Sequence, residues 1–334
     1  MTDGASLVHL DWAEAAELIQ RSQNIAVVTH VYPDGDAIGS MMGLVLALRQ
    51  HGKQATPVVD GGLPRQFAFV PGGEEILKGA DGLSPDLVIS TDASDLERLG
   101  KAGAALRNLD CPFIQLDHHQ TNLLFGDVDL VDARTVASAE VVFDWLEQLG
   151  WTPSRDVAQA LLTGIVTDTM CFRTSNVTAE TLAKSQRLMS YGADLAGIVQ
   201  RTLARQPFGL IRLYGQVLPR IRLDNGIIWV KVLAEDYKAV DMEIGEYNGL
   251  SGYLIQADEA MISVVFKQMS DREIEVSMRA VPGFDVSQVA LELGGGGHRL
   301  ASGCTLRGVD MEGAVQKVMD RLQVEIARGK PLYT

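Results

Sequence analysis

The sequence of 334 residues lacks any apolar run close to the roughly 20 residues that a membrane-spanning helix needs. Its first 11 residues also lack the basic stretch followed by an apolar one that marks an export signal. Cysteine is scarce, because only Cys111, Cys171 and Cys304 occur, and these three show no paired spacing of the zinc or redox kind. We therefore expect a cytoplasmic protein with reduced cysteines and no contact with a membrane.

Basic side chains are in the minority, and the net charge is −14 at pH 7. A protein that coats long nucleic acid needs many Lys and Arg side chains to neutralise phosphates, so the charge argues against that class. Most of the negative charge lies in residues 1–190, whereas residues 191–334 are nearly neutral. This division fits an acidic half that concentrates cations and a second half that holds an anionic substrate, although a solvated acidic surface would have the same composition.

The chain length and the hydrophobic content of 46% predict two domains with buried cores. In the first half, short and continuously apolar runs alternate with helical patterns, which indicates an α/β fold with a mostly parallel sheet and helices on both faces. The expected strands are residues 25–29, 56–59, 87–90 and 113–116, and the expected helices are residues 37–50, 138–149, 156–166 and 178–189.

The pattern changes in the second half. We expect a first domain over residues 1–192, a helical linker over 193–215, and a smaller C-terminal α/β domain over 216–334. In the last of these, the expected strands are residues 227–233, 261–267 and 273–280, and the expected helices are residues 285–293 and 311–327.

Acidic residues and histidines follow three of the predicted strands, where the ligands of an open parallel sheet collect. They are His30, Asp34, Asp36, Asp92, Asp117, His118 and His119, and Asp168 joins them at the end of a predicted helix. Each cluster alone could be a turn, a helix cap or a satisfied histidine, but their joint occurrence favours a metal site. Carboxylates and imidazoles without thiolates suit Mn²⁺ or Mg²⁺, and the histidines favour Mn²⁺. Two such ions clamp a phosphate and activate a water, which predicts hydrolysis of a phosphate ester.

A run of four glycines, residues 294–297, follows a predicted helix and precedes His298 and Arg299. Consecutive glycines let backbone N–H groups converge on an anion, although a flexible loop would have the same composition. Arg279 ends a predicted strand shortly before this run. The segment therefore predicts a phosphate-binding site in the second domain.

These motifs resemble those of the DHH phosphoesterases. The matching residues are Asp34-Gly35-Asp36 with His30 upstream, Asp92, Asp117-His118-His119, and Asp168 within residues 164–169. The glycine run with His298, followed by Ser302-Gly303, resembles the C-terminal domain that accompanies the nanoRNase and pAp-phosphatase branch of that family.

The resemblance implies a two-cation site with one shared carboxylate. The implied ligands are His30, Asp34 and Asp92 for one cation and Asp36, His118 and Asp168 for the other, with Asp92 bridging. Asp117 would orient a histidine, and His119 would face the reacting phosphate. The substrate would be bound by Arg279, Gly295, Gly296, Gly297 and His298.

The resemblance also implies a homodimeric, manganese-dependent enzyme, with Mg²⁺ as the alternative metal. Its implied substrates are short oligonucleotides, cleaved to mononucleotides, and 3′-phosphoadenosine 5′-phosphate (pAp), converted to AMP. Three alternatives stay open: a phosphodiesterase for cyclic di-AMP or pApA, a type II inorganic pyrophosphatase, and a non-catalytic nucleotide sensor. Arg98 and Arg173 lie near the metal motifs, but a structural ion pair would explain either of them equally well, so we leave both outside the predicted site.

Overall fold

The computed structural model describes residues 6–245 and 249–331. The chain forms two compact units, Met1–Arg205 and Gln206–Thr334. The segment expected as a linker is divided between them, since α7 (Leu195–Val199) belongs to the first unit and α8 (Phe208–Val217) to the second. None of the described helices is both long enough and apolar enough to cross a membrane.

The first unit contains a six-stranded sheet with the order β1-β6-β5-β4-β2-β3. Its strands are β1 (Val8–Leu10), β2 (Asn24–Thr29), β3 (Gln54–Val59), β4 (Leu87–Thr91), β5 (Phe113–Asp117) and β6 (Val128–Asp132). All neighbours are parallel except β1, which pairs antiparallel with β6. Since β3 lies on one side of β2 and β4 on the other, the strand order reverses beside β2, where open sheets bind ligands.

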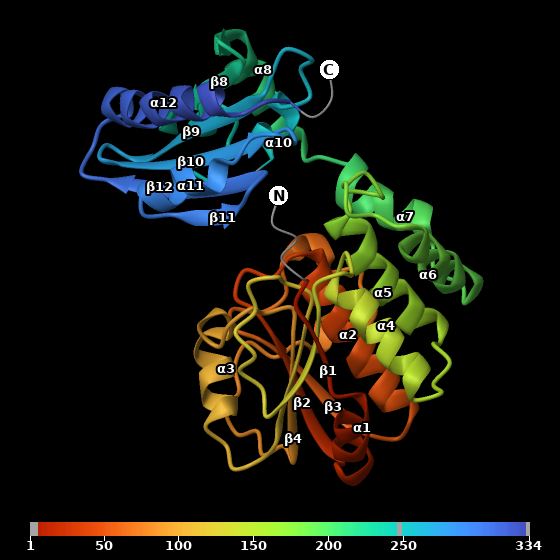
Figure 1. Ribbon diagram of the computed structural model, residues 1–334. Helices are drawn as coiled ribbons and strands as arrows, with labels where there is room; N and C mark the ends of the chain where they lie inside the picture. Colours follow the sequence, from red (N-terminus) through yellow and green to blue (C-terminus); the bar gives the residue numbers. More distant parts are fainter. Residues whose placement is uncertain (1–5, 246–248, 332–334) are drawn as a thin grey trace. The chain divides into compact units, whose positions relative to one another are not determined.

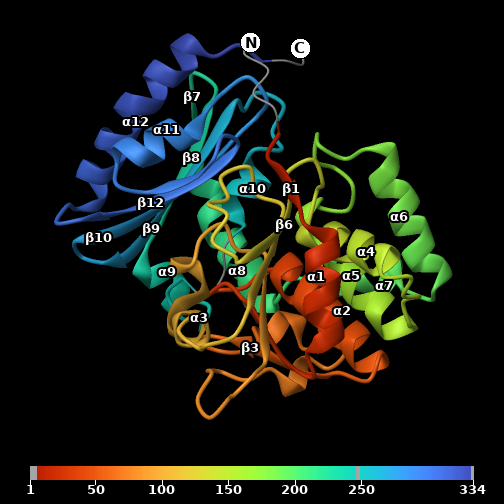
Figure 2. The same ribbon diagram turned by 60° about the horizontal axis from the view of Figure 1, so that its bottom comes forward.

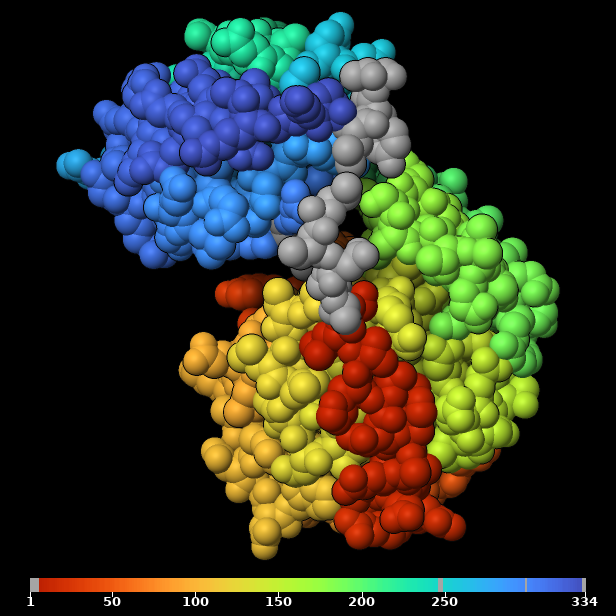
Figure 3. Space-filling view, in the orientation of Figure 1, coloured from red at the N-terminus to blue at the C-terminus, as the bar shows by residue number. Residues whose placement is uncertain are grey.

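Helices cover both faces of this sheet, as the sequence predicts, but unequally (Figure 1). The thicker layer contains α1 (Trp12–Arg21), α2 (Gly35–Gln50), α4 (Ser138–Gln148), α5 (Arg155–Asp168) and α6 (Ala179–Ser190). The opposite face packs against α3 (Gly100–Arg107). Helix α1, in red, lies at the surface of the unit (Figure 3). The main core therefore lies between the sheet and the α2–α4–α5 layer.

Two glycines allow α2 and α5 to pack closely. A Cβ atom on Gly39 would lie 2.6 Å from the carbonyl oxygen of Ala160, and one on Gly164 would lie 2.6 Å from Oδ1 of Asp36. Distances below 3.0 Å are not found for real Cβ atoms. The glycines thus let the C-terminal end of α5, with Asp168 as its last residue, approach the start of α2.

The second unit contains another six-stranded sheet with the order β11-β12-β10-β9-β8-β7. Its strands are β7 (Arg222–Asp224), β8 (Ile227–Val232), β9 (Ile262–Ser270), β10 (Glu273–Ala280), β11 (Gly296–His298) and β12 (Ala301–Arg307). Helices α11 (Val286–Glu292) and α12 (Met311–Arg328) pack on one face. On the other face, α8, α9 (Ala234–Lys238) and α10 (Leu250–Leu254) pack against β8 and β9 (Figure 2). The predicted C-terminal α/β fold is confirmed.

Candidate metal centre and substrate site

One group of predicted ligands forms around the ends of β2 and β4. Nδ1 of His30 lies 2.8 Å from the carbonyl oxygen of Val31, a hydrogen bond that leaves Nε2 facing Oδ2 of Asp92 at 3.5 Å. Asp34 caps α2, because its Oδ1 accepts hydrogen bonds from two amides of the first turn. One ligand atom each from His30, Asp34 and Asp92 lies within 4.8 Å of the others. This spacing allows a single cation to contact all three side chains.

A second group surrounds His118. Its Nε2 lies 3.7 Å from Oδ1 of Asp92 and 3.9 Å from a carboxylate oxygen of both Asp36 and Asp168. Asp92 therefore faces the His30 group with Oδ2 and the His118 group with Oδ1. The structure brings six predicted ligands together, with one carboxylate between two histidines.

Asp117 and His119, which flank His118 in the sequence, pair with each other. Oδ1 of Asp117 lies 2.7 Å from Nδ1 of His119, and its Oδ2 accepts a hydrogen bond of 2.6 Å from the Asn122 amide. Burial opposes protonation of His119, but the hydrogen bond and the charges of Asp117 and Asp92 outweigh it and raise the pKa of His119 to about 9. Asp117 thus fixes the orientation of the His119 ring, and Asn122 fixes Asp117.

The first residues of α4 hold two of the carboxylates. Backbone amides of Ser138 and Ala139 donate to the two oxygens of Asp36 at 2.6 and 3.0 Å. The hydroxyl of Ser138 donates to Oδ1 of Asp92 at 3.0 Å. A helix N-terminus favours negative charge, so α4 stabilises the ionised form of both side chains. Ser138 is not among the predicted site residues, and its position at the start of a predicted helix is the feature of the sequence that could have indicated it.

The carboxylates of the centre repel one another, and a bound cation would relieve this repulsion. Burial raises the pKa of Asp36 well above its usual value, and the charges of Asp92 and Asp168 raise it further. Burial and the neighbouring carboxylates also raise the pKa of Asp168 to about 6, although His118 opposes this. Burial would raise the pKa of Asp92 too, but the adjacent histidines hold it below its usual value. Buried, mutually repelling oxygen donors with imidazoles fit hard divalent cations.

Several residues at the centre adopt left-handed backbone conformations that non-glycine residues seldom use. Asp92 has a φ of 57°, and three consecutive residues after Asp168, namely Met170, Cys171 and Phe172, have φ values of 47°, 60° and 63°. Strain of this kind is concentrated at functional sites, where the surrounding structure maintains it. The residues with left-handed backbone conformations therefore lie at the same position in the fold as the predicted metal ligands.

The predicted substrate residues of the second unit lie on or next to strands β10, β11 and β12. Arg279, Gly295 and Gly296 line one concave surface together with Ser277 and Thr305. Burial lowers the pKa of Arg279. Nη1 of Arg279 donates a hydrogen bond of 3.0 Å to the carbonyl oxygen of Met278. This surface offers a guanidinium, hydroxyls and exposed backbone, which are donors that suit a phosphate.

Two family descriptions match the chain: "DHH family, N-terminal domain" over residues 24–165 and "DHHA1 domain" over residues 230–325. The bifunctional oligoribonuclease and PAP phosphatase NrnA of Thermus thermophilus is 35% identical over 305 residues, covering 91% of this chain and 90% of the relative. The chain belongs to the DHH family. Its C-terminal domain is the DHHA1 domain that the glycine run and Ser302-Gly303 indicate.

Two further similarities bear on this DHH protein. A crystal structure of an exopolyphosphatase-related protein from Bacteroides fragilis has the same fold, with a TM-score of 0.89, 24% identity, and coverage of 95% of this chain and 96% of that chain. The cyclic-di-AMP phosphodiesterase GdpP of Geobacillus thermodenitrificans is 25% identical over 348 residues, which cover 95% of this chain but 50% of that relative. The DHH chain thus corresponds to part of GdpP and to nearly all of NrnA.

The glycine run of the DHHA1 domain differs from the expected loop. Residues 296–298 form β11 and pair antiparallel with β12. A Cβ atom on Gly295 would lie 2.1 Å from the carbonyl oxygen of Gly303, and one on Gly297 would lie 2.6 Å from that of Ala301. These glycines let two segments pass closely, whereas Gly296 has open space at its Cβ position. The side chain of His298 lies outside the described part of the structure.

One of the two arginines that the prediction left aside lies close to the metal centre. The positive charge of Arg98 lowers the pKa of His119, so its exposed guanidinium lies near that ring. The carbonyl of Arg98 also accepts a hydrogen bond of 2.8 Å from the amide of Val31, next to His30. Arg98 is therefore placed to meet an anion that approaches the DHH triplet.

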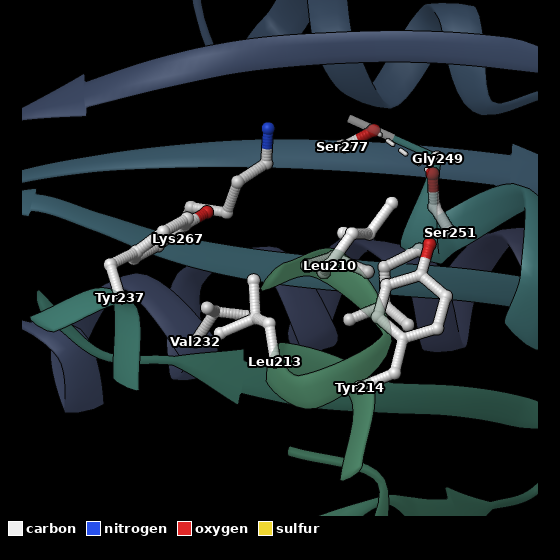
Figure 4. A pocket seen from close by; sticks show the side chains of 11 residues that line it. Leu210, Leu213, Tyr214, Val232, Tyr237, Gly249, Ser251, Lys267 and Ser277 are labelled. Carbon is white, nitrogen blue, oxygen red and sulfur yellow. Dashed lines mark hydrogen bonds between the residues drawn. The ribbon is translucent and has the colours of Figure 1, made fainter. Parts of the chain in front are cut away.

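A small cavity in the DHHA1 domain lies between the helices and the sheet (Figure 4). Leucines of α8, Tyr214 and the side chain of Lys267 surround it, and the hydroxyls of Ser251 and Ser277 form a 3.0 Å hydrogen bond at its edge. Its volume of about 20 Å³ accommodates one water molecule. The cavity is too small for a nucleotide, so the open surface at Arg279 is the better substrate site.

Proposed function

We propose that this protein hydrolyses short oligonucleotides to mononucleotides, and pAp to AMP, with two divalent cations at its metal centre. One observation carries the proposal: the carboxylate of Asp92 lies between His30 and His118, each with further carboxylates around it. A carboxylate in this position can be shared by two cations and so hold them at the separation of about 3.5–4 Å that two-metal hydrolysis uses. The 35% identity to a bifunctional oligoribonuclease and PAP phosphatase supports the choice of substrates.

The chain's own donors divide into two sets. His30, Asp34 and Asp92 would hold one cation, and the other would be held by Asp36, His118 and Asp168, with Asp92 shared. Bound there, the cations would supply Lewis acidity and a water of lowered pKa. Mn²⁺ suits this set of carboxylates and imidazoles, and Mg²⁺ is the alternative.

The side chains around the donors position the substrate. Because Nδ1 of His119 faces Asp117, Nε2 on the opposite side of the ring would be the atom that donates to a phosphate oxygen. Arg98 adds a positive charge near that ring. In the reaction, a water oxygen bonds to phosphorus, the ester P–O bond breaks, and the leaving oxygen takes up a proton. His119 and Arg98 would stabilise the charge that develops on the phosphate.

The DHHA1 domain would select the substrate. Arg279, Gly295, Gly296, Gly297 and His298 would bind one end of it, with Arg279 as the main phosphate donor. Binding at an end favours dinucleotides and short oligomers over long chains. The acidic charge of −14, which disfavours binding to long nucleic acid, agrees with this choice. We also propose that the protein is a homodimer, as the family resemblance implies, and that it is cytoplasmic, as its few unpaired cysteines indicate.

A substrate panel tests the proposal. The full-length protein would be assayed with Mn²⁺ and with Mg²⁺ on a dinucleotide, pAp, pApA, cyclic di-AMP and pyrophosphate. We expect turnover of the dinucleotide and of pAp, with Mn²⁺ the better metal. Preference for cyclic di-AMP would favour the GdpP-like alternative, preference for pyrophosphate would favour a pyrophosphatase, and tight nucleotide binding without turnover would indicate a sensor.

A further inference from the structure

Three apolar side chains of the first unit stand out by their exposure. Tyr32 is 93% exposed, Leu123 is 71% exposed and Met170 is 52% exposed. Among the described residues of this unit, these are the most exposed large hydrophobic side chains. Single exposed apolar residues need no explanation. These three, however, all lie close to residues of the metal centre in the sequence.

Each of the three belongs to a segment that carries the metal centre. Tyr32 stands between the ligands His30 and Asp34, Met170 follows Asp168 by two residues, and Leu123 follows Asn122, which holds Asp117. Two residues of chain span at most about 7 Å between Cα atoms. The three side chains therefore start from backbone immediately around the centre.

The backbone at these positions is unusual as well. Tyr32 has a φ of 55°, Met170 has a φ of 47°, and Leu124, next to Leu123, has a φ of 51°. Left-handed conformations cost free energy in non-glycine residues, and exposed side chains recover little of it by packing. Local hydrogen bonds account for two of these conformations, because the amides of Met170 and Cys171 donate to carbonyls of the last turn of α5 and the amide of Leu124 donates to Oδ1 of Asn122. The exposure of the three side chains beside the metal centre is the feature that a ligand there would explain.

We propose that Tyr32, Leu123 and Met170 form an apolar rim around the metal centre, and that this rim holds the nucleobases on either side of the phosphate that is cleaved. The inference rests on the function proposed above, since it specifies how an oligonucleotide would be held there. Every nucleobase has an apolar π-face, so an aromatic ring and two apolar side chains would bind single-stranded substrates without sequence preference. The carboxylates at the centre offer no such surface.

The test compares two phosphodiesters with and without bases. A diadenosine dinucleotide and an abasic dinucleotide of the same backbone would be assayed with Mn²⁺ for the wild type and for Tyr32→Ala. We expect the KM for the diadenosine substrate to rise about 5- to 100-fold, as the loss of one stacking contact predicts, with little change for the abasic one. Tyr32→Phe, which keeps the ring, should retain the wild-type KM.

Matched control variants distinguish the loss of a rim side chain from the general effect of shortening an exposed apolar side chain to alanine. Leu123→Ala and Met170→Ala should each raise the KM for the diadenosine substrate by a few-fold. Leu182→Ala and Met189→Ala remove exposed side chains of the same types from α6, and should leave both substrates unaffected. An unchanged KM in Tyr32→Ala, or equal losses with and without bases, would overturn the proposal.

A binding measurement keeps this inference separate from the proposed function. A dinucleotide that contains 2-aminopurine loses fluorescence when its base stacks on a tyrosine ring. We expect quenching with the wild type that is lost in Tyr32→Ala. If the wild type hydrolyses no dinucleotide, the proposed function fails, whereas equal quenching by both proteins would show that Tyr32 does not hold a base, whatever the turnover.

Discussion

The two sheets of this protein present polar side chains in opposite ways. At the edge of the first sheet, Asp36, Asp92 and Asp117 are buried and held by backbone amides, hydroxyls and imidazoles. On the second sheet, Arg279 lies on an open surface that also presents Arg307, hydroxyls and glycine backbone, together with the carboxylate of Glu275. Ligands that must be fixed and desolvated are thus kept apart from donors that must stay accessible to substrate.

The charge of the sequence follows the same division. The acidic first half contains the carboxylate cluster, which by itself would repel the phosphates of a substrate and so requires cations. In the nearly neutral second half, the surface that Arg279 lines carries one carboxylate, Glu275, and a second guanidinium, Arg307. Substitutions at Asp92, Arg279, Ser138 and Gly164 separate the contribution of the metal centre from that of the surface at Arg279.

Asp92→Asn should have the largest effect, because one carboxylate serves both halves of the metal centre. We expect kcat on a dinucleotide to fall about 10³-fold, since a metal ion supplies several kcal/mol of transition-state stabilisation. The Mn²⁺-dependent rise in Tm should also disappear; in the wild type it should correspond to about 2.7 kcal/mol at 100 times the Kd. Kinetics and thermal unfolding with and without Mn²⁺ would measure both.

The matched control for this change is Asp110→Asn, which neutralises an exposed carboxylate of the same unit. It should behave as the wild type in both measurements. Retention of activity and of the Mn²⁺-dependent Tm shift in Asp92→Asn would show that Asp92 is not the shared ligand.

Arg279→Ala should affect binding and spare the chemical step. We expect the KM for a dinucleotide to rise about 10- to 100-fold, which corresponds to one charge-assisted hydrogen bond, while kcat changes less than about threefold. Arg272→Ala, which removes an exposed arginine from the turn before β10, serves as the control and should leave both constants unchanged. A fall in kcat at constant KM would break the division between the two units.

Ser138→Ala should weaken the metal centre without removing a ligand. Its hydroxyl holds Asp92, and loss of such a supporting hydrogen bond lowers metal affinity about 10- to 100-fold. Calorimetric titration with Mn²⁺ would measure this, and Ser138→Thr should restore most of the affinity. Ser185→Ala, whose buried hydroxyl bonds only to a carbonyl of its own helix, is the control. Unchanged Mn²⁺ binding in Ser138→Ala would mean that the amides of α4 are sufficient.

The smallest effects concern two helical glycines. Gly164→Ala forces a Cβ atom against Asp36 and Ala139, so we expect it to destabilise the protein by about 1–3 kcal/mol. Gly215→Ala in α8 meets open space and should stabilise by about 0.5–1 kcal/mol. Thermal unfolding would measure both, and the same sign for the two variants would contradict the close packing at the centre.

The sequence predicted strands with a continuous apolar run better than strands that are short, contain aspartates or consist of glycine. Strands β2, β4 and β5 appear as continuous apolar runs because both of their faces are buried, and each is found where expected. The short edge strand β1 has little apolar signal, and β6, although it is buried between β1 and β5, contains two aspartates that interrupt its apolar run. The strand β11 lies within a glycine run, which predicts a turn rather than a strand. These elements depend on pairing with distant strands, so local patterns do not reveal them.

The sequence by itself determined which chemical groups are present and that most of them end buried strands. This follows because the apolar runs and the polar residues after them are local features of the chain. Only the tertiary structure decided which groups meet: His118 between Asp36, Asp92 and Asp168, Ser138 against Asp92, and Asn122 behind Asp117. Most of these contacts join segments that are far apart in the sequence, and the packing of α4 and α5 on the sheet brings the side chains within ion-pair or hydrogen-bond distance.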